Sequence, residues 1–303
     1  MLKQDRVQKH KLIATLGQTA TGKSDMAVRL AKKFNGEIIS ADSRQVYKGL
    51  DTGTGKITKR EMQGVPHHLL DVANPKKRFS VSLYKKLAEK AVADIHKRRK
   101  VSIICGGTGL YIDAVVNGII LPAVEPNLKL RKQLEKKTVK QLFEMLKKLD
   151  PGRAKTIDAQ NPRRLIRAIE IARAIGESPN LAVKPPSWDT LKIGLKLPDK
   201  ELRRKIHIRL LLRMKQGMAA EVRRLNKNGV SWKRLEAFGL EYKYIALYLQ
   251  KKITKDEMLT KLETEIWRYA KRQNTWFKRD KEVKWFDPVE FKKIEKAVKR
   301  FLI

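Results

Sequence analysis

The sequence predicts an α/β fold in which a parallel sheet is flanked by helices, with a helical insertion and a mostly helical C-terminal part. Three short apolar segments, 11–16 (KLIATL), 36–40 (GEIIS) and 101–105 (VSIIC), have strand character. Helix-forming residues begin at Ser24 and also fill 82–99. Strands that alternate with helices in this way favour a parallel sheet covered on both faces.

The first strand leads into a glycine-rich turn that fits the pattern G-x-x-x-x-G-K-[ST]. Its residues are Gly17, Gln18, Thr19, Ala20, Thr21, Gly22, Lys23 and Ser24. The glycines let successive backbone N–H groups point at phosphate oxygens, and the helix that follows adds its positive N-terminal dipole. Lys23 supplies a charge to the phosphates, and Ser24 can hold Mg²⁺. This phosphate loop predicts a P-loop NTPase-like core that binds a diphosphate or triphosphate, without specifying the reaction.

The ends of the second and third predicted strands supply the next candidate residues. The second strand leads into Asp42, and the third leads into Gly106, Gly107 and Thr108. Because the carboxyl ends of parallel strands share one edge of a sheet, Asp42 and Thr108 should flank the phosphate loop. A carboxylate there can orient Mg²⁺ or act as a general base, and a cap at the strand exit is the alternative interpretation of Asp42.

The helix predicted over 82–99 places Leu83, Leu87, Ala91 and Ile95 on one face, which is therefore expected to pack on the sheet. A further strand is predicted over 191–197 (LKIGLKL).

Residues 122–187 differ in character from the chain on either side. The stretches 127–148 and 161–175 are helical in pattern, charged and poor in β-branched residues, and prolines bracket them at 122–126 and 179–186. Such boundaries predict a hinged helical subdomain of 122–187, inserted into a core formed by 1–121 and 188–303.

The composition favours a polyanionic partner. The chain has 69 Lys and Arg residues against 32 Asp and Glu residues, a net charge of +37, while 42% of its residues are hydrophobic. The hydrophobic content excludes a disordered chain. The charge favours nucleic acid, with a lysine-rich solvated surface as the alternative.

The single cysteine, Cys105, excludes an internal disulfide and a Cys-rich zinc module. Neither a membrane-spanning apolar run nor a secretory signal is evident, so we expect a cytoplasmic protein without membrane contact.

Six motifs in order carry a resemblance to a known family. They are the phosphate loop, SADSRQVYKGLDTGTGK (40–56), GVPHHLLD (64–71), GGTGLY (106–111), NPRRLIRAIE (161–170) and KRQNTWF (271–277). Together, over about 12–286, they closely resemble the bacterial type of the tRNA dimethylallyltransferases, also called tRNA isopentenyltransferases or the IPP transferase family.

The resemblance implies transfer of a dimethylallyl group from dimethylallyl diphosphate, held by the phosphate loop with Mg²⁺. The implied acceptor is N6 of the adenosine immediately 3′ of the anticodon, in the anticodon stem-loop of tRNAs that read codons beginning with U. Asp42 corresponds to the general base, Thr108 to a threonine near the bridging oxygen of the leaving diphosphate, and Arg209 to an arginine that aids its departure. A monomer is expected. Leu211 and Arg213 depart from the family pattern around Arg209. The transfer reaction has no need of ATP, so the resemblance does not imply that ATP occupies the phosphate loop.

The resemblance also implies three segments that contact tRNA. They comprise Asp42, Ser43, Arg44 and Gln45; Arg163, Arg164, Leu165, Ile166 and Arg167; and Lys271, Arg272, Gln273, Asn274, Thr275, Trp276, Phe277 and Lys278. Two other functions share the phosphate loop. A small-molecule or nucleotide kinase would turn over ATP, and an RNA-binding protein regulated by a nucleotide would bind tRNA and transfer nothing.

Overall fold

The computed structural model describes residues 10–176 and 186–303, and their core is a parallel sheet. Its strands are β1 (His10–Gly17), β2 (Gly36–Ser40), β3 (His67–His68), β4 (Val101–Cys105), β5 (Trp188–Leu195) and β6 (Lys284–Phe286). They lie in the order β3-β2-β4-β1-β5-β6, and every pair is parallel. The predicted fold class is confirmed, and the segments 36–40 and 101–105 are strands as predicted.

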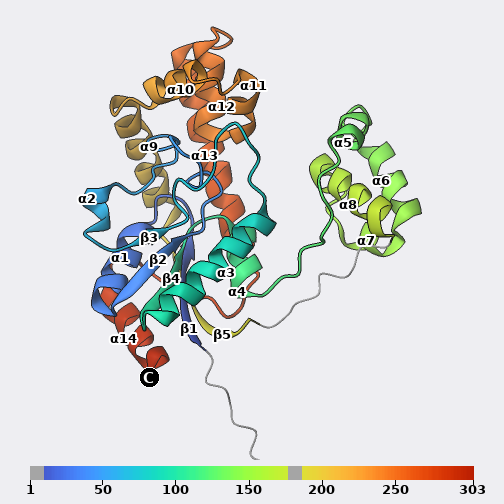
Figure 1. Ribbon diagram of the computed structural model, residues 1–303. Helices are drawn as coiled ribbons and strands as arrows, with labels where there is room; N and C mark the ends of the chain where they lie inside the picture. The colour runs from blue at the N-terminus through green and yellow to red at the C-terminus, as the bar shows by residue number, and fades with distance from the viewer. Residues whose placement is uncertain (1–9, 177–185) are drawn as a thin grey trace, which may run out of the picture. The chain divides into compact units, whose positions relative to one another are not determined.

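Helices cover both faces of this sheet (Figure 1). On one face, α1 (Lys23–Lys33) and α14 (Phe291–Leu302) pack against Ile13, Ile38 and Ile103. The neighbouring residues Leu12, Ile39 and Ile104 point to the other face, because side chains alternate along a strand. On that second face, α3 (Val81–Lys97) and α13 (Lys255–Phe277) pack against the strands. The same hydrophobic core continues into α4 (Gly109–Val116), α9 (Asp199–Lys215), α10 (Met218–Lys227), α11 (Trp232–Phe238) and α12 (Leu240–Leu249). The short helix α2 (Lys59–Met62) buries none of its residues.

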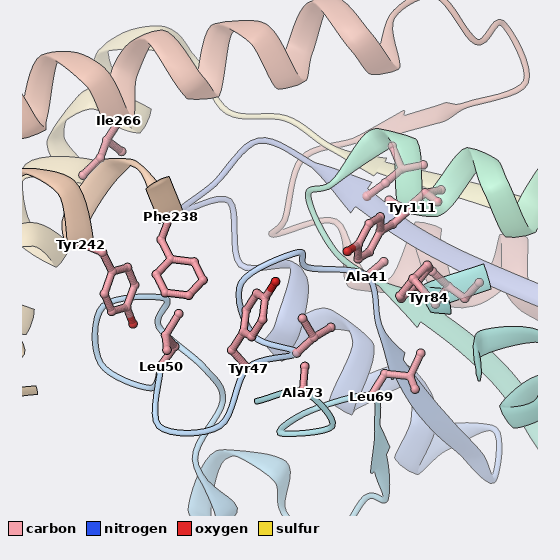
Figure 2. Packing of buried hydrophobic residues seen from close by; sticks show 14 of the residues in the cluster. Ala41, Tyr47, Leu50, Leu69, Ala73, Tyr84, Tyr111, Phe238, Tyr242 and Ile266 are labelled. Atoms are coloured by element: carbon pink, nitrogen blue, oxygen red, sulfur yellow. The ribbon is translucent and has the colours of Figure 1, made fainter. Parts of the chain in front are cut away.

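The buried face of α3 includes Ala91 and Ile95, as the sequence pattern predicts, but not Leu83. Leu83 is 43% exposed, whereas Tyr84 is fully buried and stacks on Tyr111 of α4 at 4.0 Å between ring centroids. The ring of Tyr84 therefore takes the place expected for Leu83 (Figure 2). A large aromatic side chain buries more apolar area than leucine, so it decides which face of the helix packs inward.

Of the described residues, 118–176 form a compact unit of their own. Its helices are α5 (Leu128–Leu134), α6 (Val139–Leu149), α7 (Pro151–Thr156) and α8 (Pro162–Ile175), around a core of leucines and isoleucines. The stretch 127–148, predicted to be helical, forms two helices, since Thr138 begins α6 with a capping box. Of the proline-rich boundary predicted at 179–186, residues 179–185 lie outside the described residues.

Glu170 is the buried polar centre of this unit. Its carboxylate accepts hydrogen bonds from Arg131 Nε at 2.9 Å and from the backbone N–H of Asn127 at 2.6 Å, and it also pairs with Arg167. These bonds tie α5 to α8 and lower the pKa of Glu170 despite its burial. Within 10–176 and 186–303, no helix combines the length and the apolar character that crossing a membrane requires.

Candidate active site

The phosphate loop leaves β1 at Gly17 and enters α1 at Lys23. Gly17 has a φ of +135°, and a Cβ at this position would overlap the carbonyl oxygen of Leu195 on the neighbouring strand. Only glycine therefore lets the chain turn here. Lys23 folds back over the loop and donates from Nζ to the carbonyl of Gln18. The side chains of Gln18 and Thr21 are buried, so these two residues shape the loop.

Asp42 follows β2 and caps the turn after it. Its Oδ1 accepts the backbone N–H groups of Arg44 at 2.8 Å and Gln45 at 3.3 Å. Oδ1 of Asp42 thus caps the turn at the strand exit, as the alternative interpretation expects. Among the described residues, no hydrogen bond is formed to Oδ2. The turn is anchored beyond Gln45 by Tyr47, whose ring packs edge-on against Phe238 at 5.0 Å (Figure 2). This packing holds Asp42 in place.

The loop after β4 lies next to this turn. The hydroxyl of Thr108 accepts the backbone N–H of Ser43 at 3.0 Å, and the backbone N–H of Thr108 donates to the carbonyl of Ala41 at 3.1 Å. The sheet edge therefore brings Asp42 and Thr108 together beside the phosphate loop, as the strand order requires.

The three loops enclose a cavity of about 540 Å³. Its polar lining includes Lys23, Ser24, Asp42, Gln45, Lys205, Arg209 and Gln273, and its apolar lining includes Ile57, Ile208 and Leu212. The last two project from α9 and are about half exposed. Cations and aliphatic side chains thus share one site, which suits a ligand with an anionic end and an apolar end. A second cavity, of about 440 Å³, surrounds Asp113, Lys192 and Trp276 and contains no residue of the phosphate loop.

Two cations in the larger cavity, Lys23 and Arg209, are not fully balanced by negative charges nearby. Burial lowers the pKa of Lys23 from 10.5 to about 8, and the nearby Arg209 contributes to the decrease. Burial, together with the like charge of Arg213, lowers the pKa of Arg209 to about 10. Arg209 Nη1 lies 3.4 Å from the hydroxyl of Thr19, so α9 delivers a guanidinium to the phosphate loop. A bound polyanion would stabilise both charged forms.

A buried ion pair behind Arg209 is not evident from the sequence pattern. Arg213 Nη1 lies 3.4 Å from Glu241 Oε1, and burial raises the pKa of the Glu241 carboxyl. Gly55, which has a φ of +59°, packs against the guanidinium of Arg213, where a side chain would clash. Arg213, which departs from the family pattern, is thus accommodated by Glu241 from α12 and by a glycine in the loop after β2.

The predicted tRNA-contacting segments divide into exposed and buried residues. Arg163 and Arg164 on α8, and Lys271, Arg272, Thr275 and Lys278 around α13, are exposed. The other four side chains, those of Leu165, Ile166, Gln273 and Phe277, are buried, and Phe277 is only 2% exposed. The prediction that these four side chains touch RNA is therefore corrected: they pack inside the fold. A helix turns through 3.6 residues, so a contiguous segment necessarily points some side chains into the core.

Arg167, Asn274 and Trp276 are partly buried, and two of them have partners within the fold. Arg167 pairs with Glu170 and donates from Nη2 to the carbonyl of Val124 at 2.9 Å. Trp276 Nε1 donates to Asp113 Oδ2 at 2.8 Å, and Arg279 covers its ring at 4.4 Å. Their polar groups are therefore occupied inside the protein.

Among the described residues, no group of three or more His, Cys, Asp or Glu side chains is arranged to hold a metal ion. The hydroxyl-bearing Ser24 is exposed at the start of α1, and Asp25 and Asp42 also line the cavity. This donor set is incomplete without ligand oxygens, which is the usual situation for Mg²⁺ bound through a substrate phosphate.

The sequence and the fold match one family of proteins. The family model described as IPP transferase matches residues 45–280. A protein of Treponema denticola named tRNA dimethylallyltransferase 2 is 46% identical over 276 residues, which cover 89% of this chain and 92% of that protein. The full-length tRNA isopentenylpyrophosphate transferase of Bacillus halodurans superposes with a TM-score of 0.74 at 36% identity, covering 97% of each chain. A eukaryotic dimethylallyltransferase acting on tRNA gives a TM-score of 0.76 at 25% identity, over 92% of this chain and 74% of the other. This chain belongs to the IPP transferase family.

Proposed function

We propose that the protein transfers the dimethylallyl group of dimethylallyl diphosphate to N6 of the adenosine immediately 3′ of the anticodon, in tRNAs that read codons beginning with U. The products are N6-(dimethylallyl)adenosine and diphosphate. The observation that carries the proposal is that the Asp42 carboxylate lines the same cavity as Lys23 and Arg209, in a member of this family. A base for the acceptor and cations for the leaving group therefore share one site.

The donor diphosphate would lie in the phosphate loop, with its oxygens facing the loop N–H groups, Lys23 and Arg209. As the bond from the allylic carbon to the diphosphate oxygen breaks, these groups stabilise the negative charge that develops on the departing oxygens. The aliphatic side chains of Ile57, Ile208 and Leu212 would contact the prenyl group. Ser24 together with the donor phosphates would hold Mg²⁺, which neutralises phosphate charge when bound.

The acceptor side of the reaction needs a base, because an exocyclic amine is a poor nucleophile. As N6 forms its bond to the prenyl carbon, its proton passes to a carboxylate within hydrogen-bond reach, a role that Asp42 can fill through Oδ2. Oδ1 meanwhile stays bonded to the backbone of Arg44 and Gln45, which fixes the carboxylate. The adenosine must leave its stack to reach the cavity, and an anticodon loop, being single-stranded, makes this inexpensive.

A net charge of +37 supports a tRNA partner, because phosphate neutralisation releases condensed counterions. We assign the initial contact to the exposed basic residues Arg163 and Arg164 of the 118–176 unit and Lys271, Arg272 and Lys278 of the core. We further propose a cytoplasmic monomer.

The test is incubation with unmodified bulk tRNA, Mg²⁺ and dimethylallyl diphosphate, followed by mass spectrometry of the nucleosides. We expect prenylated adenosine that depends on the diphosphate donor. ATP replaces the donor in the control, and ATP consumption without an adduct would indicate a kinase. If tRNA binds but neither an adduct nor ATP turnover is found, the protein is an RNA-binding protein and the proposal fails.

A further inference from the structure

Gln273 lies on the buried side of α13, where it joins two loops of the donor site. Its side chain is 5% exposed. Oε1 accepts the backbone N–H of Thr19 in the phosphate loop at 2.7 Å. Nε2 donates to the carbonyl of Gly107, in the loop after β4, at 2.8 Å. One side chain thus spans the exits of β1 and β4.

These two bonds require an amide at position 273. The phosphate loop presents a donor and the second loop presents an acceptor, and a single planar amide offers the matching acceptor and donor. A glutamate would place a second acceptor against the Gly107 carbonyl, and an apolar side chain would leave the buried Gly107 carbonyl and the partly buried Thr19 N–H without these partners. Gly107 fits this arrangement, because a Cβ there would overlap Gln273 Nε2.

The contacts extend from Gln273 to both halves of the proposed reaction. Gly107 precedes Thr108, whose hydroxyl holds the backbone N–H of Ser43 next to Asp42. Thr19 faces Arg209. A second bond, from Gln18 Nε2 to the carbonyl of Ala270 at 3.3 Å, ties the phosphate loop to the same helix one turn earlier.

We propose that Gln273 is a positioning residue that holds the phosphate loop and the Thr108 loop in register for the donor diphosphate. It does not contact RNA. The same helix exposes Lys271 and Arg272 on its other side, so α13 presents one face to solvent and the other to the donor site. The identity of the donor rests on the proposed function, whereas the tie between the two loops does not.

The test compares two identical substitutions in the full-length protein. Gln273→Met keeps the side-chain length and removes both bonds. Gln250→Met is the matched control, because Gln250 also makes two bonds, to Glu236 Oε1 and to the carbonyl of Ala246, at the end of α12. Calorimetry with inorganic diphosphate and with dimethylallyl diphosphate measures donor-site affinity, and filter binding measures tRNA affinity.

We expect Gln273→Met to weaken binding of both diphosphates about 10- to 100-fold, with tRNA affinity within about threefold of the unmodified protein. In steady state the donor KM should rise by a similar factor while the tRNA KM stays unchanged. Gln250→Met should alter neither affinity. Gln273→Glu is the second variant, and it should also weaken diphosphate binding, since it adds negative charge beside the phosphate loop.

Unchanged diphosphate affinity in both Gln273 variants would overturn the proposal. A loss of tRNA affinity with intact diphosphate affinity would also overturn it, because it would indicate that Gln273 contacts RNA. An equal loss of both affinities, or the same loss in Gln250→Met, would indicate a general effect on folding and would also overturn it. Failure of the proposed function can be told apart from failure of the role of Gln273. In that case the unmodified protein itself would bind inorganic diphosphate yet form no adduct with tRNA.

Discussion

Binding of the donor should weaken with rising pH in a range where an ordinary lysine stays charged. Burial lowers the pKa of Lys23 from 10.5 to about 8 in the empty site, and Arg209 adds to this effect, while Cys105 and Asp42 act in the opposite direction. A lowered pKa means that Lys23 loses its charge as the pH rises through about 8. Diphosphate stabilises the charged form, so affinity should fall as that form disappears.

The size of the effect follows from the titration. With a pKa of about 8, roughly 90% of Lys23 is protonated at pH 7 and about 10% at pH 9. If the donor binds the protonated form, its dissociation constant should rise about tenfold between these two pH values. A lysine with the ordinary pKa of 10.5 would change affinity by only a few per cent over the same interval.

The assay is calorimetric titration of dimethylallyl diphosphate at pH 7 and pH 9, with Lys23→Arg as the reference. The guanidinium stays charged throughout this range, and ionisation of the ligand affects both proteins equally. At each pH, the dissociation constant of the unmodified protein is divided by that of Lys23→Arg, so that only the effect of Lys23 remains. We expect this ratio to rise about tenfold from pH 7 to pH 9. Parallel pH profiles would refute the reasoning. If the arginine does not fit, an NMR titration of the lysine Cε signals must show one lysine near pH 8, and its absence would refute the reasoning equally.

Three other substitutions test separate parts of the structure. Asp42→Asn keeps an oxygen for the turn but cannot take a proton, so the transfer rate should fall about 10²- to 10⁴-fold in a single-turnover assay, with tRNA affinity unchanged; retained turnover would remove Asp42 from the base role. Glu221→Gln should destabilise the protein by about 1–3 kcal/mol in urea, because Glu221 accepts three backbone N–H groups of the loop after β2 and the hydroxyl of Tyr242, and an unchanged midpoint would contradict this. Glu170→Gln should speed hydrogen exchange in α5 and α8, since it leaves the charge of Arg131 without its partner, and unaltered exchange would show that the ion pair is dispensable.

The sheet and the phosphate loop could be predicted because their signals are local. Short segments with a central pair of isoleucines, 36–40 beginning at a glycine and 101–105 ending before one, indicate strands without knowledge of their neighbours. Parallel strands then fix which loops share an edge, so the proximity of Asp42 and Thr108 follows from topology.

The surroundings of the site could not be predicted because they depend on contacts between distant segments. Arg209 meets Thr19 across 190 residues and was linked to the diphosphate only by the family resemblance, and Gln273 meets Thr19 across 254 residues. No spacing rule connects such positions. Leu165, Ile166, Gln273 and Phe277 were assigned to RNA as parts of contiguous motifs, and only the helical rotation of α8 and α13 shows that they point inward.

We propose that one adenosine, beside the anticodon, receives the prenyl group in the cavity at the phosphate loop. The most direct measurement is mass spectrometry of nuclease fragments from an anticodon stem-loop incubated with Mg²⁺ and dimethylallyl diphosphate. We predict one prenyl group, on the adenosine immediately 3′ of the anticodon, and none when that adenosine is replaced by guanosine. Prenylation at another nucleotide, or an unmodified loop despite measured binding of both substrates, would contradict the account.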